Sequence, residues 1–325
     1  MTAYVVRRLL SAMLTLLGVT VILFVLFRMM PGDPTAQVIS PALDEAAQAR
    51  LKQAFGLDLP IWQQFLIHLK NMVTLEWGRS FTSGQPVAEL LGHWMVNTVL
   101  LMTTGLLLAI GIGMVLGILM AARRGGVLDN VATVVGLVCQ AAPPFVLGIL
   151  LLMGMSYQLE WFPSGGMFTA GTDPGSTWQL MTSADFLHHL VLPTITITLL
   201  YVATPMLVMR DSMLEVLGSD FVEFARAKGL SPARVLFRHA ARNSLLAVVT
   251  VSSLIVGFAI GGQVVIETVF SWPGMGKAMV DAALQHDYPV AQAAFFLLAA
   301  IVIGLNFLTD LSYSLLDPRI RLGTA

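Results

Sequence analysis

Charged residues are scarce in this chain. Asp, Glu, Lys and Arg make up 11% of its 325 residues, whereas a typical soluble domain has about 25%. Hydrophobic residues make up 56% of the chain, and its mean hydropathy is +0.79. This deficit of charge excludes an ordinary soluble domain and predicts an integral membrane protein.

Cysteine is nearly absent as well. The single Cys139 excludes a disulfide framework within the chain and a zinc cluster built on thiolates. Among the six histidines, His188 and His189 are adjacent, and neighbours on a helix point about 100° apart, which is poor geometry for one shared ion. No metal site is predicted.

A nucleotide-binding loop is also missing. The nearest sequence is Gly276-Lys277, but Ala278 stands where a P-loop needs Ser or Thr, and Ser271 stands where it needs glycine. Those glycines cradle the phosphates, and the hydroxyl binds magnesium. The chain itself is therefore expected to bind no cofactor, and no catalytic residues are predicted.

Long uncharged stretches are what the chain has in abundance. A transmembrane helix needs about 20 apolar residues, and six stretches free of Asp, Glu, Lys and Arg are long enough. They are Leu9–Phe27, Leu90–Ala122, Asn130–Leu159, Phe186–Met209, Asn243–Ile266 and Tyr288–Thr309. The first follows two arginines, as a signal peptide would, but "RMMPGDP" is not a small-residue cleavage site. The prediction is an all-α integral membrane protein with six transmembrane helices.

The distribution of Lys and Arg predicts the orientation of these helices. With the N-terminus inside, the inner segments hold Arg7, Arg8, Arg123, Arg124, Arg210, Arg226, Lys228, Arg234, Arg238, Arg242, Arg319 and Arg321. The outer segments hold only Arg50, Lys52, Lys70, Arg79 and Lys277. The positive-inside rule then places both termini in the cytoplasm. Glu267, at the outer end of the fifth span, is expected to snorkel to the interface.

The predicted spans divide the chain into three parts. Residues 1–30 hold the first helix, 31–96 form an extracytoplasmic cap segment with short helices, and 97–325 form a five-helix core with a cytoplasmic loop at 210–243. In the cap segment, "LDEAAQARLKQAF" and "PIWQQFLIHLKNMV" are predicted to be amphipathic helices. The apolar stripe of the second consists of Ile61, Phe65, Leu69 and Met72, widened by Trp62 and Leu66. It is expected to lie on the outer leaflet or to pack on the bundle.

Two pairs of glycines recur at a spacing of four inside the predicted spans. They are Gly113 with Gly117 and Gly257 with Gly261. Small residues at this spacing let helices approach closely. A specific dimerising role is one interpretation of these pairs, and the general abundance of glycine in membrane helices is the other.

The loop between the fourth and fifth spans carries a charged, amphipathic insert. Asp220 is predicted to cap a short helix, with Glu223 completing a capping box. Gly229 suits the left-handed position that ends a helix. Ser231-Pro232 is predicted to start a second helix, with Ser as the N-cap and Pro at the first helical position.

The side chains of this insert allow two interpretations. Arg234, Arg238 and Arg242 recur every four residues, and like charges at that spacing repel by about 0.2–0.5 kcal/mol. The arginines could serve only to anchor the topology. Alternatively, Phe221, Phe224 and Ala225 form an apolar knob with a charged rim, as in a docking element.

The order of motifs along the chain resembles a known family. Glu223-x-Ala225-x-x-x-Gly229 is similar to the "EAA…G" loop of permease subunits of binding-protein-dependent ABC importers. Nearly the whole chain resembles the dipeptide, oligopeptide and nickel branch of that family. The segments that carry this resemblance are "PGDP", "FGLDLPIWQQF", "WGRSFTSGQPV", "ARAKGL", "RHAARNSLL", "ETVFSWPGMGKAMVDA", "HDYPVAQA" and "LSYSLLDPRIR".

The resemblance implies a transport subunit of the bacterial inner membrane rather than an enzyme. It implies that the loop forms a coupling helix that sits in a cleft of an ATPase subunit. The implied docking residues are Glu223, Phe224, Ala225, Arg226, Lys228 and Gly229. The implied partners are a second homologous permease, two ABC ATPase subunits that use ATP and Mg, an extracytoplasmic substrate-binding protein and membrane lipids, with no nucleic acid.

The sequence departs from the family pattern at two positions and leaves the substrate open. Phe224 replaces the second small residue of "EAA", and Ala247 stands where the branch usually has proline. Peptides are the expected substrates, and a nickel or metal chelate or another small solute is the alternative within the same importer type. A secondary transporter is the alternative from another class, but the nearly charge-free spans disfavour it.

Overall fold

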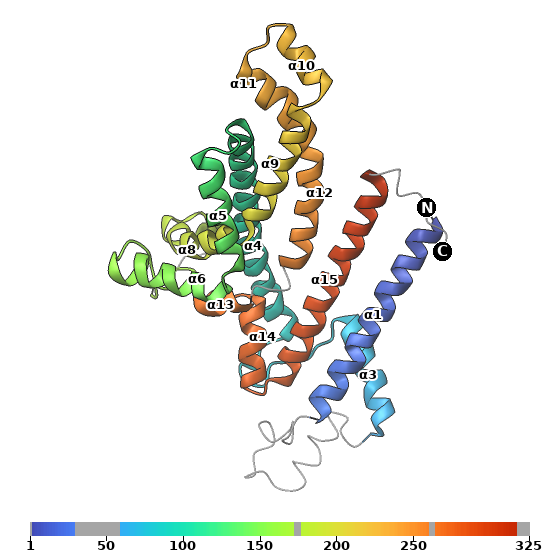
Figure 1. Ribbon diagram of the computed structural model, residues 1–325. Coiled ribbons are helices and arrows are strands. Elements are labelled where there is room, and N and C mark those ends of the chain that lie inside the picture. The colour runs from blue at the N-terminus through green and yellow to red at the C-terminus, as the bar shows by residue number, and fades with distance from the viewer. Residues whose placement is uncertain (1, 30–58, 172–176, 260–263, 317–325) are drawn as a thin grey trace. The chain divides into compact units, whose positions relative to one another are not determined.

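The protein is helical almost throughout. The computed structural model describes residues 2–29, 59–171, 177–259 and 264–316 (Figure 1). Its helices are α1 (Thr2–Met29), α3 (Ile61–Thr74), α4 (Val87–Ala122), α5 (Val127–Ala141), α6 (Pro144–Leu151), η1 (Leu152–Gln158), α7 (Thr177–Thr182), α8 (Ala184–Tyr201), α9 (Ala203–Leu217), α10 (Asp220–Ala227), α11 (Pro232–Arg234), η2 (Val235–Ala240), α12 (Ala241–Ala259), α13 (Val264–Val269), α14 (Met275–Leu284) and α15 (Tyr288–Leu316). Strand pairing within these residues is limited to one isolated bridge. The predicted all-α class is confirmed.

Several of these helices are long and apolar enough to cross a membrane. They are Val5–Arg28, Val87–Ala122, Ala184–Tyr201 and Tyr288–Leu308. The pair formed by α5 with α6 and η1 passes the same test but is bent by 109° between its two parts. The described residues therefore contain four candidate spans, or five if the bent pair is one span.

The third uncharged stretch, which was predicted to hold one span, is bent in the middle. It breaks at "AAPP", where Ala142 has an extended backbone (φ −70°, ψ 139°) and Pro144 starts α6. A residue before a proline is pushed out of the helical region by the proline ring. The fourth stretch is also interrupted, at Val202, one turn before Pro205, which has no N–H to donate to the helix.

Two compact units make up the chain, and each is described by itself. The first consists of residues 1–97 and 274–325, and the second of residues 98–273.

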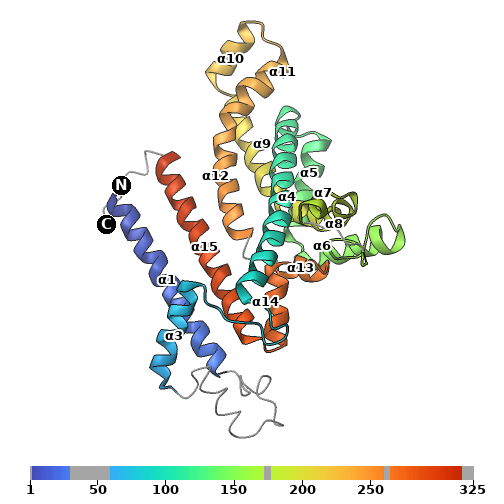
Figure 2. The ribbon, with the colours of Figure 1, turned by 180° about the vertical axis from the view of Figure 1, so that it is seen from behind.

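In the first unit, α1 and α15 lie side by side (Figures 1 and 2). The ring of Phe27 meets those of Tyr288 and Phe295 at centroid distances of 5.9 and 6.2 Å. Aromatic pairs at this separation are favourable edge-to-face contacts.

Helix α3 forms as predicted and packs on α1, but part of its stripe faces away. Phe65 lies edge-to-face on Phe24 of α1 with a centroid distance of 5.3 Å, and Met72 is buried. In contrast, Ile61, Trp62 and Leu66 are exposed. The part of the stripe around Phe65 and Met72 therefore packs within the protein, and the part around Ile61 does not. The other predicted cap helix lies outside the described residues.

A buried carboxylate organises the loop that follows α3. Asp287, which precedes α15, accepts hydrogen bonds from the Ser80 hydroxyl (2.5 Å), the Phe81 N–H (3.0 Å) and the Thr82 hydroxyl (2.8 Å). Charge-assisted hydrogen bonds of this kind are stronger than neutral ones. The segments "WGRSFTS" and "HDYP", far apart in the sequence, are thereby joined.

The second unit is built around a line of glycines on α4. A Cβ atom at Gly105 would lie 2.5 Å from the Ile197 side chain, and one at Gly117 would lie 2.5 Å from the Met206 carbonyl oxygen. A Cβ atom at Gly113 would lie 2.9 Å from the Pro205 side chain. Gly113 and Gly117 therefore both lie at a close helix–helix contact, and their partner is α9 of the same chain together with Val202, which precedes it. Gly261 of the other pair lies outside the described residues.

Glu267 is buried rather than interfacial. It lies on α13 with no exposed surface and accepts a hydrogen bond of 2.5 Å from the Thr98 hydroxyl of α4. The prediction of a snorkelling side chain is wrong, because α13 folds against α4 and encloses the carboxyl group. A buried polar group needs such hydrogen-bond partners.

Candidate functional site

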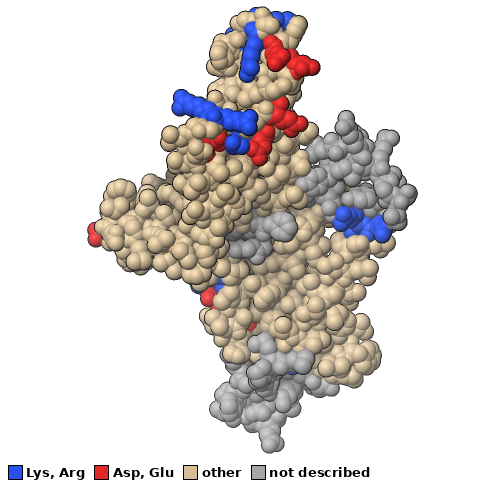
Figure 3. Space-filling model, viewed as in Figure 1, with Lys and Arg blue, Asp and Glu red and all other residues tan. Residues whose placement is uncertain are grey.

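The charged insert lies at the end of a pair of long helices. α9 enters it and α12 leaves it, and these two helices lie side by side in both views (Figures 1 and 2). The buried residues that join their ends to the end of α4 are Ile118, Ala121, Met209, Met213, Ala240, Ala241 and Val248. Charged side chains gather over α10 and α11 and the adjoining end of the pair (Figure 3).

The first helix of the insert starts one residue earlier than predicted. Ser219, with an extended backbone (φ −86°, ψ 152°), is the N-cap of α10, and its hydroxyl donates to the Val216 carbonyl rather than accepting from the helix. The prediction of Asp220 as the cap is therefore wrong. Asp220 and Glu223 lie in the first turn, where carboxylates interact favourably with the helix dipole.

The predicted glycine turn at the end of α10 is confirmed. Gly229 has φ +76°. Its N–H donates to the Arg226 carbonyl (2.9 Å), and the next N–H, of Leu230, donates to the Ala225 carbonyl (3.4 Å). These two bonds form a Schellman motif, which requires a residue in the left-handed region at Gly229.

One face of α10 packs against the rest of the insert. Val222 and Ala225 are buried with Val235 of η2, and Leu230 packs beside them. Ala225 is only 7% exposed. Its predicted place on the exposed knob is wrong, because residues 222 and 225 are three apart and share the inward face. A small side chain there lets α10 lie close to η2.

The opposite face carries the remaining predicted docking residues. The α10 surface, as we call it, consists of Phe221, Glu223, Phe224, Arg226 and Lys228, all of which are exposed. Phe221 is 45% exposed and Phe224 is 62% exposed. A large exposed aromatic side chain within a charged rim is typical of a protein-binding surface.

The second helix of the insert begins where predicted but is not regular. Ser231 precedes Pro232, which occupies the first position of α11. After three residues the chain changes to the π-helix η2, and regular α-helix resumes at Ala241. The prediction of one regular α-helix bearing Arg234, Arg238 and Arg242 is therefore wrong. Short π-helical segments often occur at functional sites.

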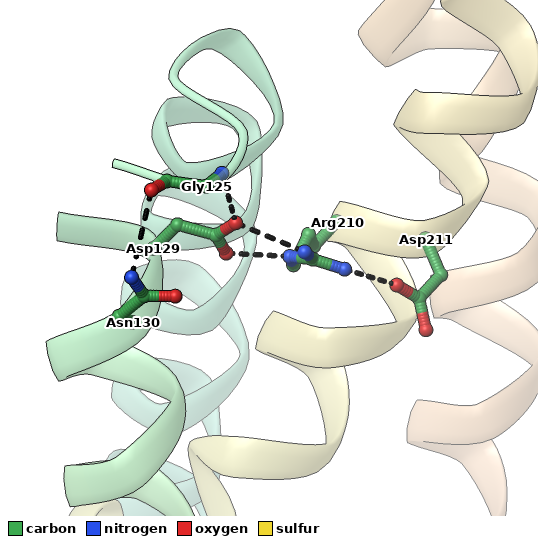
Figure 4. A network of polar contacts seen from close by, with 5 residues as sticks. All are labelled: Gly125, Asp129, Asn130, Arg210 and Asp211. Carbon is green, nitrogen blue, oxygen red and sulfur yellow. Dashed lines mark hydrogen bonds and ion pairs between the residues drawn. The ribbon is translucent and has the colours of Figure 1, made fainter. Parts of the chain in front are cut away.

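An ion pair behind the insert was not predicted. Asp129, near the start of α5 and 2% exposed, accepts hydrogen bonds from Nε (2.6 Å) and Nη2 (2.9 Å) of Arg210 on α9 (Figure 4). Nη1 of Arg210 donates to the exposed Asp211 (2.8 Å). The two partners are 81 positions apart, so no local sequence pattern relates them.

Comparison with known proteins shows the family. Residues 113–322 match the family "Binding-protein-dependent transport system inner membrane component", and residues 1–106 match its N-terminal counterpart. The chain is 38% identical over 322 residues to the oligopeptide transport system permease protein AppB of Bacillus subtilis (strain 168), covering 99% of this chain and 100% of that protein. It is 37% identical over 333 residues to the di/tripeptide transport system permease protein DppB of Pseudomonas aeruginosa (strain UCBPP-PA14), covering 99% of each.

Two further comparisons agree with this. The glutathione transport system permease protein GsiC of Escherichia coli (strain K12) is 35% identical over 321 residues, with 99% of each chain covered. A solved chain of the MetNI methionine ABC transporter, in an inward-facing conformation, shares the fold with a TM-score of 0.54 at 15% identity, covering 72% of this chain and 99% of that chain. This chain therefore belongs to the family of inner membrane components of binding-protein-dependent transport systems, and it is a multi-pass permease subunit of an ABC importer.

Proposed function

We propose that this permease forms half of the translocation pathway of an ATP-driven importer of di- or oligopeptides. The observation that carries the proposal is the similarity, over 99% of the chain, to relatives named as oligopeptide and di/tripeptide permeases. Within this proposal the chain binds no ATP. A second homologous permease completes the pathway, two ABC ATPase subunits hydrolyse ATP with Mg, and an extracytoplasmic binding protein delivers the peptide.

The proposed topology has six spans and both termini in the cytoplasm. α12 supplies the fifth span, and the bent α5–α6 pair supplies the third. The exposed cations of the α4–α5 turn, Arg123 and Arg124, and those of the insert belong to the same unit. On this topology all of them face the cytoplasm, in agreement with the positive-inside rule.

The α10 surface is the proposed docking site for an ATPase subunit. Phe221 and Phe224 supply exposed apolar area, and Glu223, Arg226 and Lys228 supply a charged rim. The Schellman motif and the contact of Ala225 with η2 hold this surface in one orientation relative to α9 and α12. ATP binding can bias the permease only if α10 contacts the ATPase differently in the two states of the transporter.

Purification of the complex tests the proposal. Solubilised from its native membranes in mild detergent, the chain should bring with it two P-loop ATPases and a second permease. Phe224→Asp should lose the ATPases and keep the second permease, because a buried charge is costly in an apolar contact. Phe168→Asp, at an exposed phenylalanine of the 159–171 loop, is the matched control and should keep all partners. Recovery of the chain alone in the unchanged protein would contradict the importer itself.

Transport assays test the substrate. In proteoliposomes that contain the purified complex and its binding protein, a radiolabelled alanine tripeptide should accumulate only when ATP is supplied. Accumulation of a nickel–histidine chelate in place of the peptide would favour the metal-chelate alternative. Uptake driven by a proton gradient without the ATPases would favour a secondary transporter.

A further inference from the structure

Asp129 connects three segments of the second unit through one carboxylate. Its Oδ2 accepts the N–H of Gly125 (2.8 Å), which lies in the α4–α5 turn, and both of its oxygens accept hydrogen bonds from Arg210 of α9 (Figure 4). Gly125 has φ +73°, a conformation in which glycine is favoured. The turn, the start of α5 and the middle of α9 are thus held at one point.

Further contacts between α5 and α9 lie at Gly136 and Gln140. A Cβ atom at Gly136 would lie 2.7 Å from the end of the Met206 side chain, and Nε2 of Gln140 donates to the Thr204 hydroxyl (3.0 Å). A cavity of about 340 Å³ with an apolar lining lies among α4, α5, α8 and the start of α9, and Cys139 of α5 lines it. α5 touches α9 at Gly136, where an added Cβ atom would also lie 3.4 Å from the Ala203 Cβ, but the cavity beside this contact leaves the apolar packing of α5 incomplete.

Helix α9 packs on α4 with backbone against backbone. At Gly117 of α4, an added Cβ atom would lie 2.5 Å from the Met206 carbonyl oxygen, 2.7 Å from the Met209 Cβ and 3.0 Å from the Arg210 N. The two backbones therefore touch beside Arg210. Seven residues beyond Arg210, α9 ends at Leu217, and α10 begins three residues later. Arg210 thus lies on α9, one of the two helices that connect the insert to the rest of the unit.

We propose that Asp129 and Arg210 are positioning residues that make α5 follow the movement of α10. This inference rests on the proposed coupling role of α10. When an ATPase subunit displaces α10, α9 and α4 move together because their backbones are in contact. The bidentate ion pair makes α5 move with them, although the cavity leaves the apolar packing around α5 incomplete. Without the ion pair, α10 would still dock on the ATPase subunit. The position of α5 would then change much less between the nucleotide-free and the ATP-trapped states.

Cys139 provides a direct probe of α5. It is the single cysteine of the chain, is partly exposed and lines the cavity. In the complete transporter in lipid nanodiscs, its rate of modification by N-ethylmaleimide is followed through the intact mass of this chain. The rate is measured without nucleotide and after trapping with ATP, Mg and vanadate. The ATPase rate of the same samples is measured in parallel.

The variants separate the proposed role from a merely structural one. Asp129→Asn removes the charge, and Arg210→Lys keeps a charge but loses the bidentate geometry. Both should reduce the difference in labelling rate between the two states by about tenfold, within the range of ordinary coupling between sites, while the ATPases stay bound and active. Asp129→Glu should restore part of the difference. Asp211→Asn removes the exposed partner of the same arginine and is the control that should behave like the unchanged protein.

Two results would overturn this inference. One is a labelling rate of Cys139 in the unchanged transporter that is the same in both nucleotide states. The other is a full labelling difference in both Asp129→Asn and Arg210→Lys. If one of these variants fails to assemble, the other decides. Failure of the proposed function itself looks different, because ATPase subunits would then be absent from the purified complex before any labelling is done.

Discussion

The Nζ atom of Lys228 lies 4.5 Å from the ring centroid of Phe224, on the exposed face of α10. A cation over an aromatic face at this distance contributes about 0.5–1 kcal/mol at an exposed site. The contact restrains the phenylalanine that replaces the small residue of the family pattern. The bulkier side chain is therefore presented together with a charge rather than as an isolated apolar group.

This contact predicts unequal effects of two substitutions on ATPase binding. Phe224→Ala should weaken the affinity of the purified permease complex for its ATPase by more than about 1 kcal/mol, as for an anchoring interface residue. Lys228→Gln should have a smaller effect that depends on salt. Titration in nanodiscs at two ionic strengths measures both. Equal affinities for Phe224→Ala and the unchanged protein would show that the ATPase binds elsewhere.

The left-handed turn at Gly229 predicts a purely conformational effect of substitution. A Cβ atom there would meet no described atom within 4 Å, so a larger side chain would cause no steric clash. Valine should nevertheless destabilise the turn by about 1–2 kcal/mol, because a β-branched residue is disfavoured at φ +76°. Gly229→Val should lower ATP-driven uptake, and Gly229→Asn, which tolerates this conformation, should largely keep it. Normal uptake by the valine variant would contradict the turn.

The glycines of α4 predict a contrast between two identical substitutions. Gly117→Ala places a methyl group 2.5 Å from the Met206 carbonyl oxygen, whereas a Cβ atom at Gly111, on the same helix, has no described neighbour within 4 Å. Overpacking of this kind costs about 1–3 kcal/mol. Thermal unfolding in detergent should show a lowered midpoint for Gly117→Ala and an unchanged or raised midpoint for Gly111→Ala. The opposite order would contradict the contact between α4 and α9.

The buried Asp287 predicts protection of the loop at 79–86 from protease. Asp287→Ala leaves the Ser80 and Thr82 donors without their acceptor, at a cost of about 1–3 kcal/mol. Trypsin should then cleave after Arg79 faster than in the unchanged protein. Asp281→Ala, at a carboxylate with 43% side-chain exposure that pairs with Lys277, is the control and should leave the cleavage rate unchanged.

The amino-acid sequence by itself determined the class of this protein and the family to which it belongs. Long stretches without charge can be stable as helices in a membrane, because an apolar solvent forces the backbone to bond within its own segment. The Gly229 turn and the Ser231-Pro232 start were equally predictable, since backbone conformation at such residues is a local property. The order of the family motifs could be read without any structure.

Only the tertiary structure decided which side chains face one another. The sequence placed Ala225 on the docking surface and Glu267 at the interface, but both are buried. The pairing of Asp129 with Arg210, across 81 positions, has no sequence signal. Burial and ion pairing depend on how separate helices pack, and that packing follows from contacts such as those at Gly117, which a single helix cannot specify alone.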